Sequence, residues 1–179
     1  MKKYGGRMNR KFFVAASVLA SLILVSSALA SDIIQRSAHF YAQAGVSDSP
    51  VKVIRATGDI TQRVKSPGTR NFGDFTAVIT GKFKPLDPSL TKTFTVSAIL
   101  RDFSGCVFND EGQSVKCDGP GRLIVTGTML RYMATDVDVH IEVNGESVKF
   151  QVTKLVDGQT EILIDWIDIT MVKYRYEIK

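Results

Sequence analysis

Side chains that can bind a divalent cation or move protons occur at every second position of one stretch: Asp136, Asp138, His140 and Glu142. Because alternate side chains of a β-strand share a face, a strand here would place all four near enough to share one ion. Carboxylate oxygens suit Ca²⁺, and imidazole nitrogens suit Zn²⁺. We expect instead a solvated face on which Lys149 of a neighbouring strand offsets the acidic charge. The sequence therefore predicts no cofactor and no metal, with these four residues as the weak candidates.

The chain contains two cysteines, Cys106 and Cys117. The turn-forming residues Asn109-Asp110-Glu111-Gly112 lie between them, so two short arms can bring the cysteines opposite each other in a register centred on Glu111-Gly112. The stretch has no C-x-x-C redox motif, no zinc-ligand spacing and no D-x-D-x-D-G calcium loop. We predict a structural disulfide, which contributes about 3 kcal/mol in the chain-entropy model.

Nucleophilic catalysis needs a serine or cysteine beside a base. The two histidines, His39 and His140, lie near no G-x-S-x-G motif. The stretch Asp118-Gly119-Pro120-Gly121 lacks the lysine and the strand-to-helix setting of a phosphate-binding loop, and we interpret it as a turn. The sequence therefore predicts a protein that is not an enzyme.

The elements that position these residues are predicted to be strands. Segments rich in β-branched and aromatic residues alternate with turn signals such as Ser66-Pro67-Gly68, and no 3.6-residue apolar period follows residue 30. This pattern favours an all-β, antiparallel β-sandwich; a closed β-barrel is the alternative, because both folds have the same period. The predicted strands are 51–57, 59–64, 74–80, 93–101, 122–133, 137–143, 146–155 and 161–178.

The clearest hairpin is predicted around Asn144-Gly145, the preferred pair for a two-residue type I′ turn. That turn places an apolar residue opposite an apolar residue along one face and a polar residue opposite a polar one along the other. The predicted apolar pairs are Ile141 with Val148, Val139 with Phe150, and Val137 with Val152.

Two loops are possible in the next hairpin, around Asp157-Gly158, and they differ by one residue in register. A two-residue loop would place Phe150 opposite Asp165, whereas a three-residue loop over 156–158 places Phe150 opposite Ile164 and Lys149 opposite Asp165. We therefore predict the three-residue loop, with a bulge at Gly158 and a further bend near Asp168. The predicted core stripe is Val148, Phe150, Val152, Ile162, Ile164 and Trp166.

Residues 1–30 have the plan of a secretory signal. A basic head without acidic residues precedes an apolar run over 12–30, which ends in Ala28-Leu29-Ala30, a cleavage site before Ser31. The alternative is an uncleaved membrane-anchor helix over 12–30, which would be the chain's only contact with a membrane. Either interpretation predicts an exported protein that is secreted, periplasmic or at the cell surface.

The charge of the chain belongs to this leader. The leader holds five of the 23 Lys and Arg residues and none of the 18 Asp and Glu residues, so the remainder carries equal numbers of each. The formal net charge of +5 therefore gives no support to nucleic-acid binding.

After the leader we predict an N-terminal extension over 31–50 and a single β-domain over 51–179. Residues 31–45 alternate like a strand that docks on its own sheet or completes a neighbour's sheet, although Arg36 interrupts the apolar side. The expected function is binding or assembly at the cell surface or envelope, with a protein partner or self-association, and N-terminal strand addition is one route to it. The alternative is a β-barrel carrier of a small apolar ligand.

Overall fold

The computed structural model describes residues 33–45, 51–83, 92–127 and 131–179. Ile34–Lys179 form one compact unit, and all the regular structure described in it is β-strand. The predicted signal sequence over 1–30 lies outside the described residues. The strands are β1 (Ile34–Gly45), β2 (Val51–Val64), β3 (Thr69–Phe83), β4 (Lys92–Leu100), β5 (Cys106–Asn109), β6 (Ser114–Gly127), β7 (Arg131–Val143), β8 (Ser147–Val156) and β9 (Gln159–Ile178).

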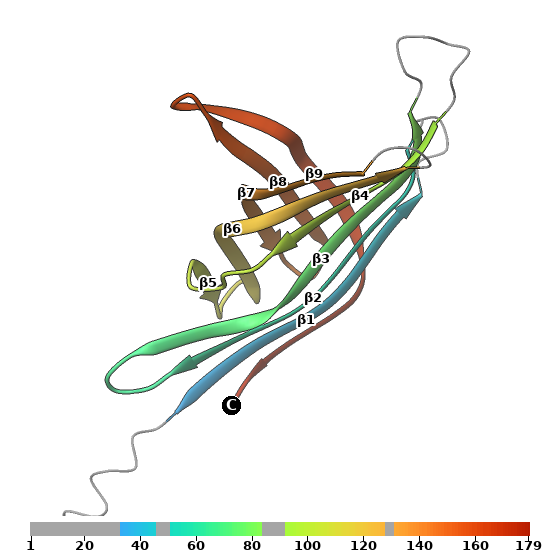
Figure 1. The fold of residues 1–179 in the computed structure, drawn as a ribbon. Coiled ribbons are helices and arrows are strands. Elements are labelled where there is room, and N and C mark those ends of the chain that lie inside the picture. Colours follow the sequence, from blue (N-terminus) through green and yellow to red (C-terminus); the bar gives the residue numbers. More distant parts are fainter. Residues whose placement is uncertain (1–32, 46–50, 84–91, 128–130) are drawn as a thin grey trace, which may run out of the picture. The chain divides into compact units, whose positions relative to one another are not determined.

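Eight strands close into an antiparallel barrel, and β5 is an additional strand on β6 (Figure 1). Apart from β4 and β5, neighbours in the chain pair with each other; β4 pairs with β6, and β9 pairs with β1 to complete the ring. The predicted all-β antiparallel class is confirmed. The β-sandwich is wrong and the closed barrel is right, because the β1–β9 ladder, from Arg36 opposite Ile178 to Ala42 opposite Met171, pairs the edges that a sandwich leaves free.

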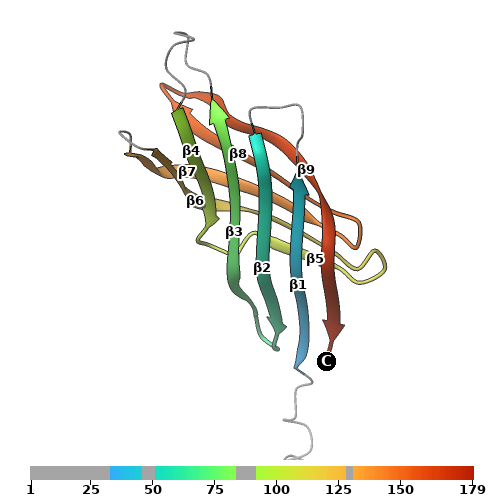
Figure 2. The same cartoon turned by 90° about the vertical axis from the view of Figure 1, so that its right-hand side faces the viewer.

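β1 lies within the segment that the sequence analysis assigned to an extension. It pairs with β2 from Ile34 to Gly45 and with β9 on its other edge, as Figure 2 shows. Its alternation is that of a half-buried strand, since Ala38, Phe40 and Ala42 face the interior and are buried. The β-domain therefore begins at Ile34 rather than at residue 51, and β1 completes the sheet of its own chain.

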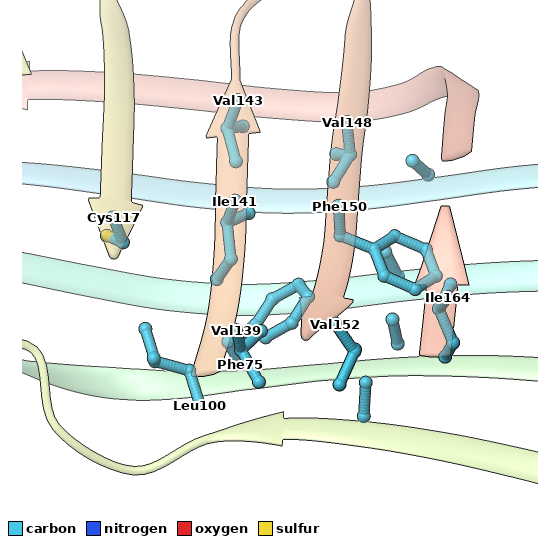
Figure 3. Packing of buried hydrophobic residues seen from close by; sticks show 14 of the residues in the cluster. Phe75, Leu100, Cys117, Val139, Ile141, Val143, Val148, Phe150, Val152 and Ile164 are labelled. Atoms are coloured by element: carbon cyan, nitrogen blue, oxygen red, sulfur yellow. The ribbon is translucent and has the colours of Figure 1, made fainter. Parts of the chain in front are cut away.

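Aromatic rings from three strands fill the middle of the barrel. The ring centroid of Phe75 on β3 lies 6.3 Å from that of Phe40 on β1 and 6.4 Å from that of Phe150 on β8. Figure 3 shows aliphatic side chains of β7 and β8, such as Val139 and Val152, around them. Both Phe75 and Phe150 are fully buried, so the barrel has a packed side-chain core.

The predicted turn at 118–121 is wrong, because these residues belong to β6. One edge of β6 pairs with β5 over Ser114–Cys117 and then with β4 over Gly121–Gly127. A Cβ atom at Gly121 would lie 2.4 Å from Cγ2 of Val139 and 2.5 Å from the carbonyl oxygen of Ile99. The glycine there permits close packing of strands rather than a reversal of the chain.

Two other strand predictions differ from the structure. The segments predicted separately at 51–57 and 59–64 form the continuous strand β2, and the single strand predicted at 122–133 is divided between β6 and β7. In both places the composition was read correctly as strand, and only the boundaries were misplaced.

The β7–β8 hairpin forms with a register two residues from the predicted one. Val143 pairs with Val148 and Ile141 with Phe150, so Gly145-Glu146 form the loop. The side-chain oxygen of Asn144 accepts hydrogen bonds of 2.8 Å from the backbone N–H groups of Glu146 and Ser147, which fixes the turn one position later. A shift by two residues leaves every side chain on its predicted face, so the apolar face is still the buried one.

The β8–β9 turn is the two-residue loop that the sequence analysis rejected. Asp157 and Gly158 have φ values of 51° and 80°, and Val156 pairs with Gln159. These angles fit a type I′ turn, whose twist matches that of the strands. The predicted three-residue loop is therefore wrong.

Irregularities farther along the β8–β9 ladder bring the apolar residues back to the interior. The register shifts around Val152, so Val152 pairs with Ile164, Phe150 with Ile167, and Lys149 with Asp168 rather than with Asp165. Val148, Phe150, Val152 and Ile164 are buried as predicted, joined by Ile169. Ile162 is 60% exposed and Trp166 36% exposed, which corrects their assignment to the core stripe.

Candidate functional site

The four weak candidates for a metal site lie on the outer side of β7, as the alternation predicted. Their strand neighbours Val137, Val139 and Ile141 are buried. Within the described ranges, no three His, Cys, Asp or Glu side chains gather closely enough to hold a metal ion. Two ion pairs join Asp136 to Lys154 (3.3 Å) and Glu142 to Lys116 (3.4 Å), and His140 Nδ1 lies 2.5 Å from a carboxylate oxygen of Asp118.

Cys106 and Cys117 are opposite each other in the β5–β6 register, as predicted. Their Sγ atoms are 2.00 Å apart and their Cα atoms 4.0 Å apart, so the pair is placed for a disulfide. The side-chain oxygen of Asn109 accepts a 3.1 Å hydrogen bond from the backbone N–H of Gly112, which closes the connecting turn. This hairpin has a structural role, because its tip holds Asp110 against β1.

Arg36 and Asp110 connect the β5–β6 tip to the start of β1. The Arg36 Nε donates to both carboxylate oxygens of Asp110 at 2.8 Å, and the Tyr176 hydroxyl donates to Asp110 at 2.6 Å. These hydrogen bonds, that of Arg36 first, lower the pKa of Asp110. Burial, together with the bond to Asp110, raises the pKa of Tyr176, and burial raises that of Tyr174 to about 12. Arg36, which interrupts the apolar side of β1, thus lies at the end of the barrel and is paired with Asp110.

Charged residues meet residues of the same sign on the outer face of the β2–β3 hairpin. Arg63 is directly opposite Arg70, and Asp59 is directly opposite Asp74. The pair between these two rows is Thr61 with Phe72. Directly opposed like charges destabilise a sheet by about 0.2–1 kcal/mol per pair. We call these residues the β2–β3 patch: Asp59, Arg63, Arg70, Phe72 and Asp74, together with Thr61, which faces outward by its register but is buried.

No carboxylate in the described part of the chain lies within ion-pair distance of the patch arginines. Arg63 donates to the Gln35 side chain at 3.1 Å and lies over the Phe72 ring, 5.3 Å from its centroid. The side chains of Arg70 and Asp74 form no hydrogen bond or ion pair with another described residue. Asp59 has one partner, Nδ1 of His39 at 3.0 Å. The patch therefore retains charge that the described part of its own chain does not neutralise.

Two hollows flank Phe72, whose side chain is 38% exposed. One, of about 570 Å³, is cationic, since it is lined by Arg63, Lys65 and Arg70 with the hairpin turn. The other, of about 490 Å³, extends across β1 and β9 and includes Asp59 and Asp74. Phe72 lines both hollows, so it separates a cationic recess from one that carries the acidic pair.

The His39–Asp59 pair resembles two members of a catalytic triad. Ser37 is two residues from His39 on the same strand, and it is buried. Among the residues that the structure describes, no serine or cysteine is hydrogen-bonded to the other ring nitrogen of His39. Within the described residues, the geometry accordingly supplies a histidine–carboxylate contact and no nucleophile bonded to the histidine.

The β2–β3 patch was not predicted from the sequence. The turn at Ser66-Pro67-Gly68 was recognised, and the hydrogen bond from the Lys65 N–H to the Gly68 carbonyl (2.7 Å) confirms it. Counting outward from that turn would have paired Arg63 with Arg70 and Asp59 with Asp74. The register of the β2–β3 hairpin was therefore the sequence signal that could have revealed the patch.

Comparison of the chain with protein-family models, with curated proteins and with solved structures finds no match. Over the described residues, no helix has the length and apolar character needed to cross a membrane.

Proposed function

We propose that this chain is an exported, non-enzymatic β-domain that acts by binding or assembly at the cell surface or in the envelope. The composition of residues 1–30 supports export, and the paired cysteines suit an oxidising compartment. The binding surface is the outer wall of the barrel around β1, β2 and β3, where the two hollows meet at Phe72.

One observation carries this proposal: the barrel closes on itself around a packed core. Both edges of β1 pair within its own chain, so addition of this strand to a neighbour would first require the ring to open. A small apolar ligand inside the barrel would have to displace rings such as Phe75 and Phe150, which are fully buried. These observations support our proposal that binding occurs at the outside of the barrel, in place of strand addition or carriage of a ligand inside it.

Export is tested with the full chain expressed in a bacterial host. A variant with Leu24→Arg in the apolar run serves as the control, because a charge there impairs a signal sequence. We expect the wild type in the envelope or medium with both thiols protected from alkylation, and the variant in the cytoplasm with both thiols reactive. Recovery of the wild type in the cytoplasm with free thiols would contradict the proposal.

Binding at the outside is separated from carriage by native mass spectrometry of the protein after mild extraction. We expect the mass of the chain or of its integer multiples. A retained lipid-like mass, removed by organic extraction, would instead favour the carrier function.

A further inference from the structure

The β2–β3 patch carries opposite charges at its two ends. Along each strand the arginine and the aspartate are four positions apart, which corresponds to about 14 Å in an extended strand. The row of arginines and the row of aspartates therefore lie on either side of the row that contains Phe72. Arg63 and Asp59 are both on β2, and Arg70 and Asp74 are both on β3. Each strand thus has a cation at the hairpin end and an anion nearer the body of the barrel.

We propose that this patch binds a second copy of the chain across a two-fold axis that passes over the Thr61–Phe72 row. Such an axis lies in the interface, perpendicular to the strands, and it exchanges the two ends of each strand. Arg63 then faces Asp59 of the other copy, Arg70 faces Asp74, and Phe72 faces its own equivalent. Isologous contacts need a self-complementary surface, and this order of charges along the strands is self-complementary.

The two hollows beside Phe72 provide room for this arrangement. The recess lined by Asp59 and Asp74 lies on the side of Phe72 that the arginines of the second copy would enter. Guanidinium groups reach such a recess on long side chains, and they form two hydrogen bonds with one carboxylate. The like-charged pairs that are unfavourable in one chain would become four ion pairs between two chains.

The rest of this wall offsets only part of its own charge. Arg175 and Lys179 on the β9 side both bind Glu177, at 3.4 and 3.1 Å, so this carboxylate balances one of the two positive charges beside the acidic row. Lys65, next to the turn, has no ion-pair partner among the described residues, and it adds charge at the cationic end. That cationic end by itself would also suit an anionic membrane surface, but a membrane would leave the acidic row without a partner, whereas a second copy provides one.

A site-specific cross-link tests the position of the axis. In the full chain, Phe72→Cys places a thiol at the axis, where packed sheets are about 10 Å apart and a short bismaleimide can join two copies. The matched control, Thr76→Cys, lies on the same face of β3 but would be about 27 Å from its equivalent. We expect cross-linked dimer from the first variant alone, with equal labelling of both by a monofunctional maleimide. Equal cross-linking of the two variants would overturn the proposal.

Charge reversal tests the chemistry. The variants Arg63→Glu/Arg70→Glu and Asp59→Lys/Asp74→Lys each make the patch one sign throughout, so each is expected to weaken the wild-type dimer at least tenfold, as an order of magnitude. Mixing the two variants creates opposite patches, and we expect a heterodimer with wild-type affinity that weakens as salt is raised. Native mass spectrometry distinguishes the species by mass.

Two outcomes would contradict this inference: a wild-type chain that stays monomeric at low salt and high concentration, or variants that fail to pair when mixed. Binding of the monomeric wild type to vesicles of anionic lipid, lost in Arg63→Glu/Arg70→Glu, would assign the cationic row to a membrane instead. The inference rests on the proposed function only in placing binding at the outer wall. A failed export experiment would not change the result of the dimer measurement, and a monomeric protein would not change the result of the export experiment.

Discussion

The outer faces of the β7–β8 and β2–β3 hairpins are built on the same kind of inner face, yet their charges are arranged in opposite ways. On β7–β8, Glu142 is paired in register with Lys149, and Lys149 is 3.6 Å from Asp168 of β9. On β2–β3, arginine is opposite arginine and aspartate is opposite aspartate.

This difference separates outward charges that stabilise the sheet, as on β7–β8, from outward charges that do not, as on β2–β3. The inner residues of both hairpins, among them Phe75 and Phe150, are buried in one core. Closure of the barrel therefore depends equally on the two hairpins, and each outer face is free to differ. A face whose charges are matched across its strands is complete by itself, whereas the β2–β3 patch gains by meeting another charged surface.

The largest expected effect contrasts one glycine from each hairpin. A Cβ at Gly73 would lie 2.2 Å from the carbonyl oxygen of Asp59, so Gly73→Ala must shift β2 against β3. At Gly145 the nearest atom would be 3.9 Å away, an ordinary contact. We expect Gly73→Ala to lower the free energy of unfolding by about 2 kcal/mol or more, and Gly145→Ala to change it by less than about 0.5 kcal/mol. Urea denaturation measures both free energies of unfolding. Equal losses of stability in the two variants would mean that the packing of β2 against β3 at Gly73 is not tight.

A smaller effect should have opposite signs on the two hairpins. Arg70→Glu turns a like-charged pair with Arg63 into an opposite pair, so it should stabilise the monomer by about 0.2–1 kcal/mol. Lys149→Glu places an acid opposite Glu142 and beside Asp168, so it should destabilise by a similar amount. Both changes should shrink in high salt, as thermal unfolding of dilute protein would show. A loss of stability in Arg70→Glu would remove the contrast between the hairpins.

The smallest expected effect concerns the contact that joins β1 to the β5–β6 tip. The pKa of Asp110 is lowered in the folded state, so the stability it contributes is present above its unfolded pKa of about 4 and is lost as pH falls through the folded value. Asp110→Asn lacks this dependence. The stability difference between wild type and Asp110→Asn should therefore narrow from about pH 6 to about pH 3, measured by urea midpoints. A difference that stays constant would mean that Asp110 is not held as a carboxylate by Arg36.

Alternation predicted the faces of the strands well, because it reports whether each side chain is wet or buried. Val148, Phe150 and Val152 were placed inside before any pairing was known, and a two-residue error in the β7–β8 register did not move them. Closure was not predictable in this way. It depends on the pairing of β1 with β9, at opposite ends of the sequence, and on whether Asp118–Gly121 extends a strand or ends one.

The candidate surface was missed for a related reason. Asp59 and Arg63 are ordinary polar residues when each strand is considered alone, and only the β2–β3 register gives them like-charged neighbours. A bend of β9 was expected near Asp168. In the β8–β9 ladder the register shifts lie instead between Ile162 and Ile167, because the tight turn at Asp157-Gly158 left the wrong face inward until a bulge corrected it. The β1–β9 ladder has a further shift between Met171 and Lys173. The residues Asp157-Gly158 favour a two-residue turn, and burial requires the apolar residues of β9 to face inward. The register shifts allow β9 to meet both requirements.

The seam between β1 and β9 is bonded like the rest of the ring. Gln35 and Lys179 exchange two backbone hydrogen bonds of 2.8 Å, which bring residues from opposite ends of the sheet into one ladder. A short peptide could therefore bridge residues 179 and 34, and the chain could instead be opened at Asp157-Gly158 without losing a rung. Such a circular permutant would keep the whole barrel, because in a closed ring every strand is paired on both edges wherever the chain begins.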